Sequence, residues 1–492
     1  MKLRETLLGL EGLKAKGDLD LDINGIECNS ENIKEGNMFV AIKGNDIDGH
    51  DFINDAISKG AKAILIEEGC DLKKIKLQDG VTIVMAPNTR VALAYTSSNF
   101  YGNPTKRLKL IGITGTKGKT TTTFMIKEIL EKAGKKVGLI GTIGTYINGQ
   151  MVATNDRTTP ESVELQKIFA QMVKEDVEYV VMEVSSQSLK LHRVDNCKFD
   201  LVAFTNLSED HISEKEHANI EEYFESKLEL FKMCNKGFTN ADDLYGAKIV
   251  GLFPESSINT YGIDNYANMM ARDVTVSNTY ADFRTKLEDR NERIKVGIPG
   301  RYSVYNALLA ISICKKLGIS AESIRDALTD VKVPGRSEMI ENKRELPIMI
   351  DYAHTPNSLQ CILETVKKYT PGRVICVFGC GGDRDKTKRP IMGEISGKIA
   401  DYTIITSDNP RTEKPEDIIK EIEAGIKNKT KDYKTIVDRK EAIKYAIDMA
   451  NKRDLIVIAG KGHETYQEIN GEKIPFYERE IIKEITNNKK QK

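Results

Sequence analysis

The chain has 492 residues, and its 73 Lys+Arg balance 73 Asp+Glu, so the formal net charge at pH 7 is zero. A chain of this length corresponds to about three domains, each large enough to bury its own core. Zero net charge argues against a general polyanion binder, which carries a basic excess. No apolar run approaches the roughly 20 residues of a membrane span, and no signal peptide is evident. The eight scattered cysteines fit reduced thiols. We therefore expect a cytoplasmic monomer with neither nucleic-acid nor membrane partners.

Residues 1–100 are predicted to form a small α/β domain. Short apolar runs alternate with helical patterns, and Tyr101-Gly102-Asn103-Pro104 marks a junction. The expected strands are 38–42, 61–67 and 81–85, and the expected helices are 53–59 and one within 88–104.

Residues 101–333 are predicted to form a central domain. The apolar run 108–114 leads through a Gly-rich turn into a helix over 120–133, and strands at 136–140, 179–183 and 201–204 alternate with helical segments. Such alternation predicts a parallel sheet covered on both faces. Segment 269–296 alternates like antiparallel strands, which we expect to extend that sheet. Helices at 302–317 and 321–331 complete the domain, and Pro334-Gly335 marks its end.

Residues 334–492 are predicted to form a Rossmann-like doubly wound domain. The expected strands are 348–351, 373–378, 402–406 and 454–459, and the expected helices are 358–368, 391–400, 415–426 and 440–450. The fold class is thus α/β with three domains, the central one of P-loop ATPase type.

The strongest motif is the Gly-rich turn at residues 114–120 (TGTKGKT), between a strand and a helix. Glycines let backbone N–H groups face a phosphate, and the helix N-terminus adds partial positive charge. Lys119 would then reach the β/γ-phosphates and Thr120 would bind Mg²⁺. The strict Walker pattern fails because Ile113 stands where its first glycine belongs. A glycine-rich loop without nucleotide is the alternative, but the flanking strand and helix favour ATP.

Three further residues indicate a site near this loop. Glu183 ends an apolar strand, where a carboxylate suits Mg²⁺, although it could instead cap neighbouring N–H groups. His211 follows another strand end, as a ligand or a hydrogen-bonding residue. Lys227 lies beside the apolar face of an amphipathic helix, and periodicity alone favours a lysine that extends its ammonium to solvent.

Together these motifs resemble the Mur ligase family, whose members use ATP to form amide bonds on peptidoglycan precursors. The resemblance rests on residues 114–122 (TGTKGKTTT), 182–186 (MEVSS), 207–211 (LSEDH), Lys227, 351–356 (DYAHTP), 379–386 (GCGGDRDK), 408–411 (DNPR) and 460–464 (GKGHE). It implies ATP and Mg²⁺ as cofactors and an acyl-phosphate intermediate formed on the D-Glu γ-carboxylate of a uridine-linked muramoyl dipeptide. Such an enzyme must cancel repulsion between anions and exclude water.

The resemblance also implies individual roles. The implied catalytic residues are Lys119, Glu183, His211, Lys227 and His354. The implied ATP contacts are Gly115, Thr116, Lys117, Gly118, Lys119, Thr120, Thr121, Asn306, Arg336 and Asp351. The implied contacts to the uridine-linked precursor are Ser30, Asn45, Asp46, Ile47, Thr158, Thr159, Ser185 and Arg193. The implied magnesium ligands are Thr120, Glu183, His211 and Lys227, the last as a carbamate (N6-carboxylysine).

Within the family, the C-terminal motifs favour members that add meso-2,6-diaminopimelate. The residues implied to hold this amino acid are Arg384, Asp408, Asn409, Pro410, Arg411, Gly460 and Glu464. An arginine fork binds a carboxylate that lysine lacks, so lysine would leave Arg411 without an anion. The alternatives are a lysine-adding ligase, a folylpolyglutamate-type ligase, or a catalytically silent ATP-binding scaffold. Strand and glycines at 374–382 also resemble a dinucleotide site, but charged residues follow them.

Overall fold

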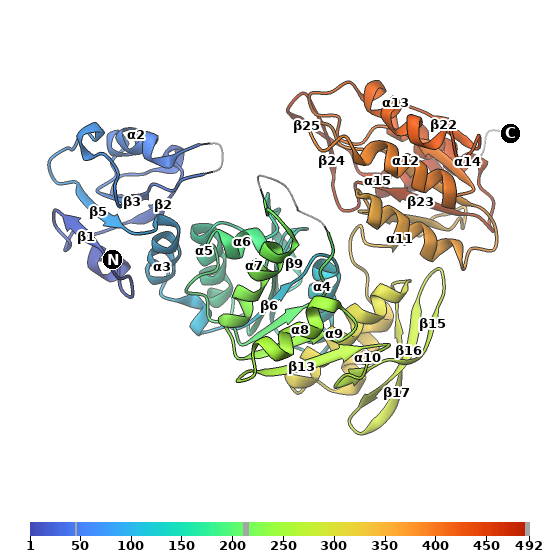
Figure 1. Cartoon of the computed structure of the whole chain (residues 1–492), viewed down its shortest axis with the longest axis horizontal. Coiled ribbons are helices and arrows are strands. Elements are labelled where there is room, and N and C mark those ends of the chain that lie inside the picture. Colours follow the sequence, from blue (N-terminus) through green and yellow to red (C-terminus); the bar gives the residue numbers. More distant parts are fainter. Residues whose placement is uncertain (45–46, 210–215, 488–492) are drawn as a thin grey trace. The chain divides into compact units, whose positions relative to one another are not determined.

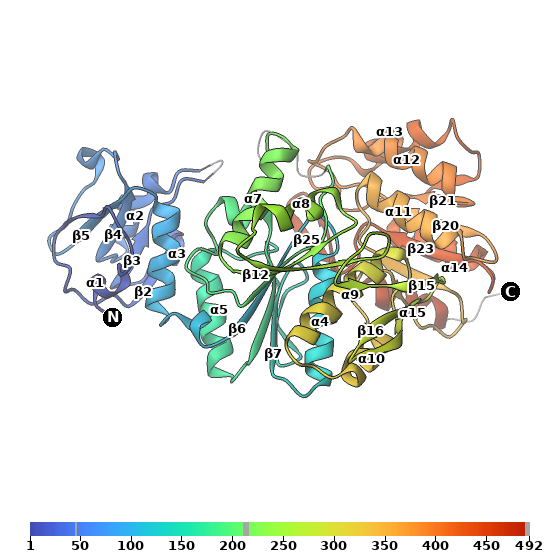
Figure 2. The same ribbon diagram turned by 60° about the horizontal axis from the view of Figure 1, so that its bottom comes forward.

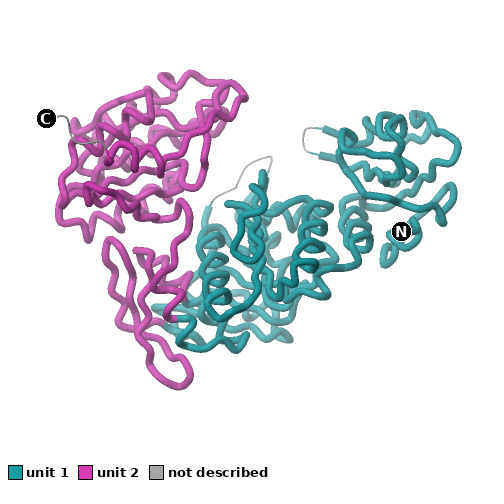
Figure 3. Tube along the Cα trace, turned by 180° about the vertical axis from the view of Figure 1, so that it is seen from behind, with its two compact units in different colours: residues 1–270, 308–324 teal, residues 271–307, 325–492 magenta. Residues whose placement is uncertain are grey.

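The computed structural model describes residues 1–44, 47–209 and 216–487. The chain divides into two compact units, one of residues 1–270 with 308–324 and one of residues 271–307 with 325–492 (Figure 3). All eight cysteines are free. Within the described ranges, no helix has the length and apolar character that crossing a membrane requires.

The first unit begins with a five-stranded sheet of order β1-β5-β4-β3-β2 (Figure 1). Its strands are parallel except β1, which pairs antiparallel with β5. The strands are β1 (Lys14–Lys16), β2 (Gly25–Glu27), β3 (Asn37–Val40), β4 (Ala63–Glu67) and β5 (Thr82–Ala86), and the helices are α1 (Leu3–Thr6), α2 (Ile53–Ser58) and α3 (Thr89–Phe100). The three-residue strand β1 was missed because all its residues are exposed and carry no apolar pattern.

The same unit contains a nine-stranded sheet of order β14-β13-β12-β11-β6-β10-β7-β8-β9. Strands from β14 to β7 are parallel, and β8 and β9 add an antiparallel edge. The strands are β6 (Lys109–Thr114), β7 (Val137–Ile140), β8 (Thr145–Ile147), β9 (Gln150–Ala153), β10 (Tyr179–Glu183), β11 (Leu201–Phe204), β12 (Lys236–Asn240), β13 (Ser257–Gly262) and β14 (Met269–Met270). The helices are α4 (Lys119–Lys132), α5 (Ser162–Lys174), α6 (Ser186–Lys190), α7 (Ile220–Lys232) and α8 (Leu244–Leu252).

Helices cover both faces of this sheet, as predicted. Helix α4 contacts β6, β7 and β10. Residues of α5 and α7 share a second core with the side chains of the opposite face, and Figure 2 shows α4 and α5 on opposite sides of the strands. Since β10 and β11 both pair in parallel with β6, Thr114, Glu183 and Phe204 end at one edge of the sheet.

The prediction that segment 269–296 extends the central sheet is wrong. Only β14 joins it, whereas β15 (Arg272–Val276), β16 (Ala281–Leu287) and β17 (Arg290–Val296) form a separate antiparallel sheet in the second unit. The reason lies in their pattern. Buried and exposed residues alternate along β16, so it needs cover on one face only, while strands inside a parallel sheet are apolar on both.

The second unit is dominated by a six-stranded sheet of order β18-β19-β23-β20-β21-β22, parallel except for β18. A hairpin, β24–β25, lies beyond it in the chain. The strands are β18 (Glu338–Met339), β19 (Ile348–Asp351), β20 (Val374–Phe378), β21 (Tyr402–Ile405), β22 (Tyr433–Thr435), β23 (Leu455–Ala459), β24 (Tyr466–Ile469) and β25 (Glu472–Pro475). The helices of residues 301–487 are α9 (Arg301–Lys316), α10 (Ala321–Asp330), α11 (Pro356–Lys367), α12 (Lys388–Ile399), α13 (Pro415–Ile426), α14 (Arg439–Met449) and α15 (Glu478–Asn487). Buried apolar side chains cover both faces, which confirms the doubly wound prediction.

Candidate active site

The predicted phosphate loop lies between the end of β6 and the first turn of α4. Its two glycines have positive φ angles, 137° at Gly115 and 87° at Gly118, where an L side chain is strained. A Cβ on Gly115 would also come within 1.9 Å of Thr205 Oγ1. The backbone can therefore turn here only with glycine, which leaves the start of α4 free to face an anion.

Thr205 and Asn206, the two residues that directly follow β11, hold this loop. Asn206 accepts from the N–H of Thr116 through its carbonyl, at 2.8 Å, and from that of Lys117 through Oδ1, at 3.0 Å. Its Nδ2 donates to the carbonyl of Lys117 at 2.9 Å, and Thr205 Oγ1 donates to the same oxygen at 2.7 Å. Sequence reasoning missed both roles, although the polar run after the strand was a signal.

Two of the four predicted magnesium ligands, Thr120 and Glu183, are in contact. Glu183 is only 1% exposed, and its Oε2 accepts from Thr120 Oγ1 at 3.0 Å. The backbone N–H and the hydroxyl of Thr142 also donate to this carboxylate, at 2.9 and 3.1 Å. A buried carboxylate beside hydroxyl oxygens is a donor set that suits Mg²⁺. No cluster of three His, Cys, Asp or Glu occurs among the described residues.

Lys227 points inward and not to solvent. It is 1% exposed on α7, its Nζ donates to the carbonyl of Gly115 at 3.1 Å, and it lies 4.1 Å from the centre of the Tyr223 ring. Lys119 Nζ donates to the same carbonyl at 2.8 Å. Two ammonium groups thus converge on the phosphate loop, and the solvent-directed alternative for Lys227 is wrong.

Of the histidines near this loop, His211 lies outside the described residues. His217 is buried, and its Nε2 lies 2.9 Å from Ser186 Oγ. Burial and the nearby Lys190 lower the pKa of His217 below its usual value. A neutral imidazole at this position supports the start of α6.

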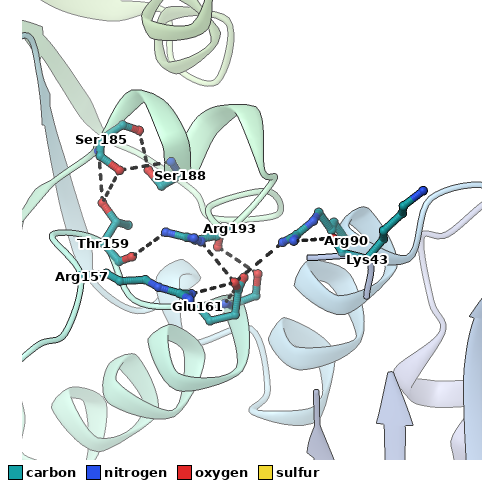
Figure 4. A network of polar contacts seen from close by, with 9 residues as sticks. Lys43, Arg90, Arg157, Thr159, Glu161, Ser185, Ser188 and Arg193 are labelled. Carbon is teal, nitrogen blue, oxygen red and sulfur yellow. Dashed lines mark hydrogen bonds and ion pairs between the residues drawn. The ribbon is translucent and has the colours of Figure 1, made fainter. Parts of the chain in front are cut away.

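Three of the residues predicted to hold the muramoyl peptide, Thr159, Ser185 and Arg193, lie together in one polar network (Figure 4). Thr158 Oγ1 is 3.1 Å from Thr142 Oγ1, and Thr159 Oγ1 donates to the carbonyl of Glu183 at 2.9 Å. The N–H of Ser185 donates to Thr159 Oγ1 at 3.1 Å. The segment before α5 is thereby tied to the carboxyl end of β10.

Arg193 belongs to a cluster of arginines around one carboxylate. Its Nε donates to Glu161 Oε2 at 3.2 Å, and its NH1 donates to the carbonyl of Thr159 at 3.3 Å. Arg157 and Arg90 also reach Glu161 Oε2, at 3.4 and 3.8 Å (Figure 4). Arg90 lies on α3, the helix that follows the five-stranded sheet in the chain. Its ion pair with Glu161 was not predicted from the sequence.

Of the remaining residues predicted to bind the precursor, Ser30 and Ile47 belong to the segment that contains the five-stranded sheet. Ser30 is buried at the start of a short 3₁₀ turn, and its carbonyl accepts from Lys59 Nζ at 3.2 Å. Ile47 is 65% exposed. Asn45 and Asp46 lie outside the described residues.

In the second unit, Asp351 at the end of β19 contacts Ser337, the residue that follows Arg336. Asp351 accepts from the N–H groups of Ser337 and Ala353 at 2.7 and 2.8 Å, and burial raises the pKa of this carboxyl. The Arg336 guanidinium stacks 4.7 Å from the ring centre of Tyr352. Its buried Nε has no hydrogen-bond partner within the described ranges, which fits contact with a ligand. Asn306 is half-buried on α9.

Two histidines flank Tyr352. The ring centres of His354 and His463 lie 4.5 and 4.9 Å from its own. His354 Nδ1 is 2.8 Å from the carbonyl of Tyr352, and burial lowers the pKa of His354. Burial and nearby cations, Arg336 first, lower the pKa of His463 to about 3. Both rings are therefore neutral at pH 7.

The predicted acceptor residues occupy two loops, 408–411 after β21 and 460–464 after β23. The fully buried Lys461 links them: its Nζ donates to Asn409 Oδ1 at 2.8 Å and to Glu464 Oε2 at 3.0 Å. Asn409 Nδ2 donates to the same Glu464 oxygen at 2.8 Å. Gly460, with φ 115°, comes so close that a Cβ would lie 2.4 Å from Asp408 Oδ2. Pro410 is buried beside them.

Arg411 is already oriented by the hairpin. Its Nε donates to Glu468 Oε2 at 3.0 Å and its NH1 donates to the carbonyl of Gly382 at 2.7 Å. Glu468, on β24, was not among the predicted residues because nothing in its local sequence signals a partner. Arg384 is exposed in the preceding loop and is not brought to this cluster by any described contact.

Comparisons with known proteins match this picture. Three family models cover the chain: the Mur ligase family catalytic domain over residues 22–101, the Mur ligase middle domain over 113–314, and the Mur ligase glutamate ligase domain over 335–462. The UDP-N-acetylmuramoyl-L-alanyl-D-glutamate–2,6-diaminopimelate ligase of Caldanaerobacter subterraneus subsp. tengcongensis is 48% identical over 99% of both chains. The ligase of the same name from Clostridium botulinum is 46% identical over 94% of this chain and 95% of its own.

Solved structures agree. A structure of a UDP-N-acetylmuramoyl-L-alanyl-D-glutamate–2,6-diaminopimelate ligase matches with a TM-score of 0.71 at 28% identity, over 99% of both chains. The MurF ligase of Thermotoga maritima, solved in complex with ADP, shares the fold with a TM-score of 0.62 at 21% identity, over 89% of this chain and 94% of its own. Fold and site define an ATP-dependent ligase. The chain belongs to the Mur ligase family.

Proposed function

We propose that this protein joins meso-2,6-diaminopimelate to UDP-N-acetylmuramoyl-L-alanyl-D-glutamate at the expense of ATP, in peptidoglycan precursor synthesis. The observation that carries the assignment is 48% identity over 99% of the chain to a ligase of that name. The half-buried Lys119 and the buried Glu183 and Lys227 around the phosphate loop support it, because a catalytically silent scaffold has no need of buried charges there.

The reaction has two steps. An oxygen of the D-Glu γ-carboxylate attacks the γ-phosphorus of ATP, and ADP leaves. The amine of the acceptor then attacks the acyl carbon, inorganic phosphate leaves, and the amine loses a proton. Both steps bring anionic groups together, so preorganised cations and N–H groups provide the rate enhancement.

The residues divide these tasks. The Gly-rich loop and Lys119 bind the phosphates, while Thr158, Thr159, Ser185 and Arg193 hold the muramoyl peptide. Thr120 and Glu183 would bind Mg²⁺, which neutralises phosphate charge when bound. Arg336, Asp351, His354 and Asn306 are proposed as further contacts to ATP.

Lys227 is proposed to act as a carbamate. Its neutral amine adds to the carbon of CO₂ and releases a proton, which replaces a cation by an anion at the phosphate loop, beside the carbonyl of Gly115. His211 is proposed as a further ligand at this position. The ring of Tyr223 and the carbonyl of Gly115 fix the lysine side chain.

The acceptor is proposed to bind in loops 408–411 and 460–464. Arg411, held by Glu468 and the carbonyl of Gly382, presents its guanidinium for the second carboxylate of diaminopimelate. Arg384 would add a second cation, and Glu464 with the carbonyl of Gly460 would take the distal ammonium. Lysine would leave Arg411 without an anion.

The deciding experiment is amide formation from the uridine-linked dipeptide and ATP, with meso-diaminopimelate or L-lysine as acceptor. We expect kcat/KM for diaminopimelate to exceed that for lysine by about 100-fold, corresponding to roughly 3 kcal/mol for one charged contact. A preference for lysine would contradict the acceptor assignment. ADP release without amide formation would contradict the ligase itself.

We further propose three domains, 1–100, 101–333 and 334–492, in a cytoplasmic monomer. Light scattering during gel filtration tests the oligomeric state, and an elution mass above the 55.1 kDa of one chain would contradict it.

A further inference from the structure

Arg439 is a buried arginine whose partners point to a role outside the residues assigned so far. It is the first residue of α14, and its side chain is fully buried. Its Nε donates to Glu478 Oε1 at 2.7 Å, its NH2 to the carbonyl of Ala459 at 2.9 Å, and its NH1 to the carbonyl of Ser407 at 3.3 Å. One guanidinium thus has three acceptors in three different segments.

The two carbonyls belong to the residues that immediately precede the acceptor loops. Ser407 follows β21 and comes directly before Asp408, and Ala459 is the last residue of β23 and comes directly before Gly460. These strands are not neighbours, since β20 lies between them. Arg439 therefore fixes the distance between the starting points of both loops.

Glu478 supplies the charge that this arrangement needs. It is the first residue of α15, and it is as deeply buried as Arg439. Burial lowers the pKa of Arg439, but attraction to Glu478, Asp408 and Glu464 outweighs it. A buried ion pair contributes little net stability compared with apolar side chains of similar size. Its presence here indicates that the pair fixes the positions of the two loops and does not serve to raise the free energy of unfolding.

The next residue extends the connection to the turn that carries Arg336. Arg479 forms a two-pronged ion pair with Glu338, and the Nε to Oε1 distance is 2.7 Å. Glu338 Oε2 in turn accepts from the N–H of Gly335 at 2.6 Å. That turn lies directly against the second loop, since a Cβ on Gly335 would be 2.1 Å from the N atom of His463.

We propose that Arg439 is a positioning residue for the amino-acid acceptor: with Glu478 it sets the spacing of loops 408–411 and 460–464. The proposal rests on the proposed function, in which these loops bind the acceptor.

The test compares KM values for the three substrates in the full-length enzyme. Arg439→Lys keeps the charge but cannot reach three acceptors, and we expect KM for diaminopimelate to rise about tenfold while KM for ATP and for the precursor changes less than twofold. The double variant Arg439→Met with Glu478→Met removes both charges without leaving one unpaired, so it should fold and show the same KM pattern.

Lys440→Ala is the matched control. Lys440 follows Arg439 on α14 and pairs with Glu484 on α15 at 3.0 Å, so it joins the same helices, but the pair is exposed. We expect unchanged KM values for this variant. An acceptor KM that stays at the wild-type value in both Arg439 variants would overturn the proposal, as would an equal rise for all three substrates. Failure of the wild-type enzyme to use diaminopimelate would instead reject the proposed function.

Discussion

The phosphate loop after β6 and the acceptor loops after β21 and β23 are held by different kinds of contact. Around the phosphate loop, hydrogen bonds do the holding: the side chains of Asn206, Thr205, Lys119 and Lys227 bind its backbone, and the hydroxyls of Thr120 and Thr142 donate to Glu183. The acceptor loops instead are fixed by ion pairs, which range from half-buried to fully buried. These pairs are Lys461 with Glu464, Arg411 with Glu468, and Arg439 with Glu478.

This difference follows from what each region has to bind. The phosphate region has to bind an anion, and the hydrogen bonds from the ammonium groups of Lys119 and Lys227 to the carbonyl of Gly115 keep both cations at the phosphate loop. The acceptor is a zwitterion that differs from its competitor by one carboxylate. Rejecting that competitor needs charges fixed in place, because an unpaired buried charge is costly.

Lys227→Ala tests the charge balance of the phosphate region and should have the largest effect. Removal of a carbamate from a site that stabilises transferred phosphate should lower kcat by about 100- to 1000-fold. Short carboxylates such as formate or acetate should restore part of the lost activity. Restoration by short alkylamines, with none by carboxylates, would show that Lys227 acts as an ammonium.

Arg411→Ala and Glu468→Gln together test the acceptor region. Loss of the guanidinium should lower kcat/KM for diaminopimelate about 100-fold and leave KM for ATP unchanged. Glu468→Gln should give a smaller loss, about tenfold, because the arginine remains but is less well oriented. Glu472→Gln, on the other strand of the same hairpin, is the exposed control. Equal losses for ATP and acceptor in Arg411→Ala would contradict the assignment.

Asn206→Ala tests how far the hydrogen bonds of the Asn206 side chain fix the conformation of the phosphate loop. The variant removes two side-chain hydrogen bonds at Lys117, each contributing about 1 kcal/mol. We expect KM for ATP to rise roughly tenfold with KM for diaminopimelate unchanged. Unchanged ATP kinetics would mean that the carbonyl of Asn206 and Thr205 suffice.

His463 gives the smallest effect, on stability and not on catalysis. Its pKa is lowered to about 3 in the folded protein, mainly by burial, whereas an unfolded histidine titrates near 6.5. The unfolded chain therefore binds a proton first, and stability falls as the pH drops below about 6.5. From pH 7 to 5, His463→Gln should lose about 1–2 kcal/mol less than the wild type in urea unfolding. Parallel losses in both proteins would contradict a neutral buried His463.

Much of the fold could be predicted from sequence, because strands such as β10 and β11 are continuous apolar runs whose limits match the structure. Segment 269–296 failed because local alternation says that strands are antiparallel but not which sheet they join. In the site, Glu183 and the phosphate loop were predictable from strand ends and glycines. Periodicity alone predicted an exposed ammonium group for Lys227. This prediction failed because a lysine beside an apolar face can point inward where a backbone carbonyl and an aromatic ring can contact its ammonium group.

Other contacts were beyond sequence reasoning because their partners are distant in the chain. Glu468 lies 57 residues from Arg411, and Glu478 lies 39 from Arg439. The sequence around each of these residues predicts an ordinary exposed charged side chain. Only the sheet topology brings them together.

The carboxylate of Glu161 has a kinetic consequence. Three arginines, Arg90, Arg157 and Arg193, surround one acid, which leaves a local excess of two positive charges (three minus one) in a chain of zero net charge. At physiological ionic strength such an excess extends only about 8 Å. An anionic precursor would therefore be held after arrival and not drawn in from afar. In stopped-flow binding, added salt should accelerate its dissociation far more than it slows its association.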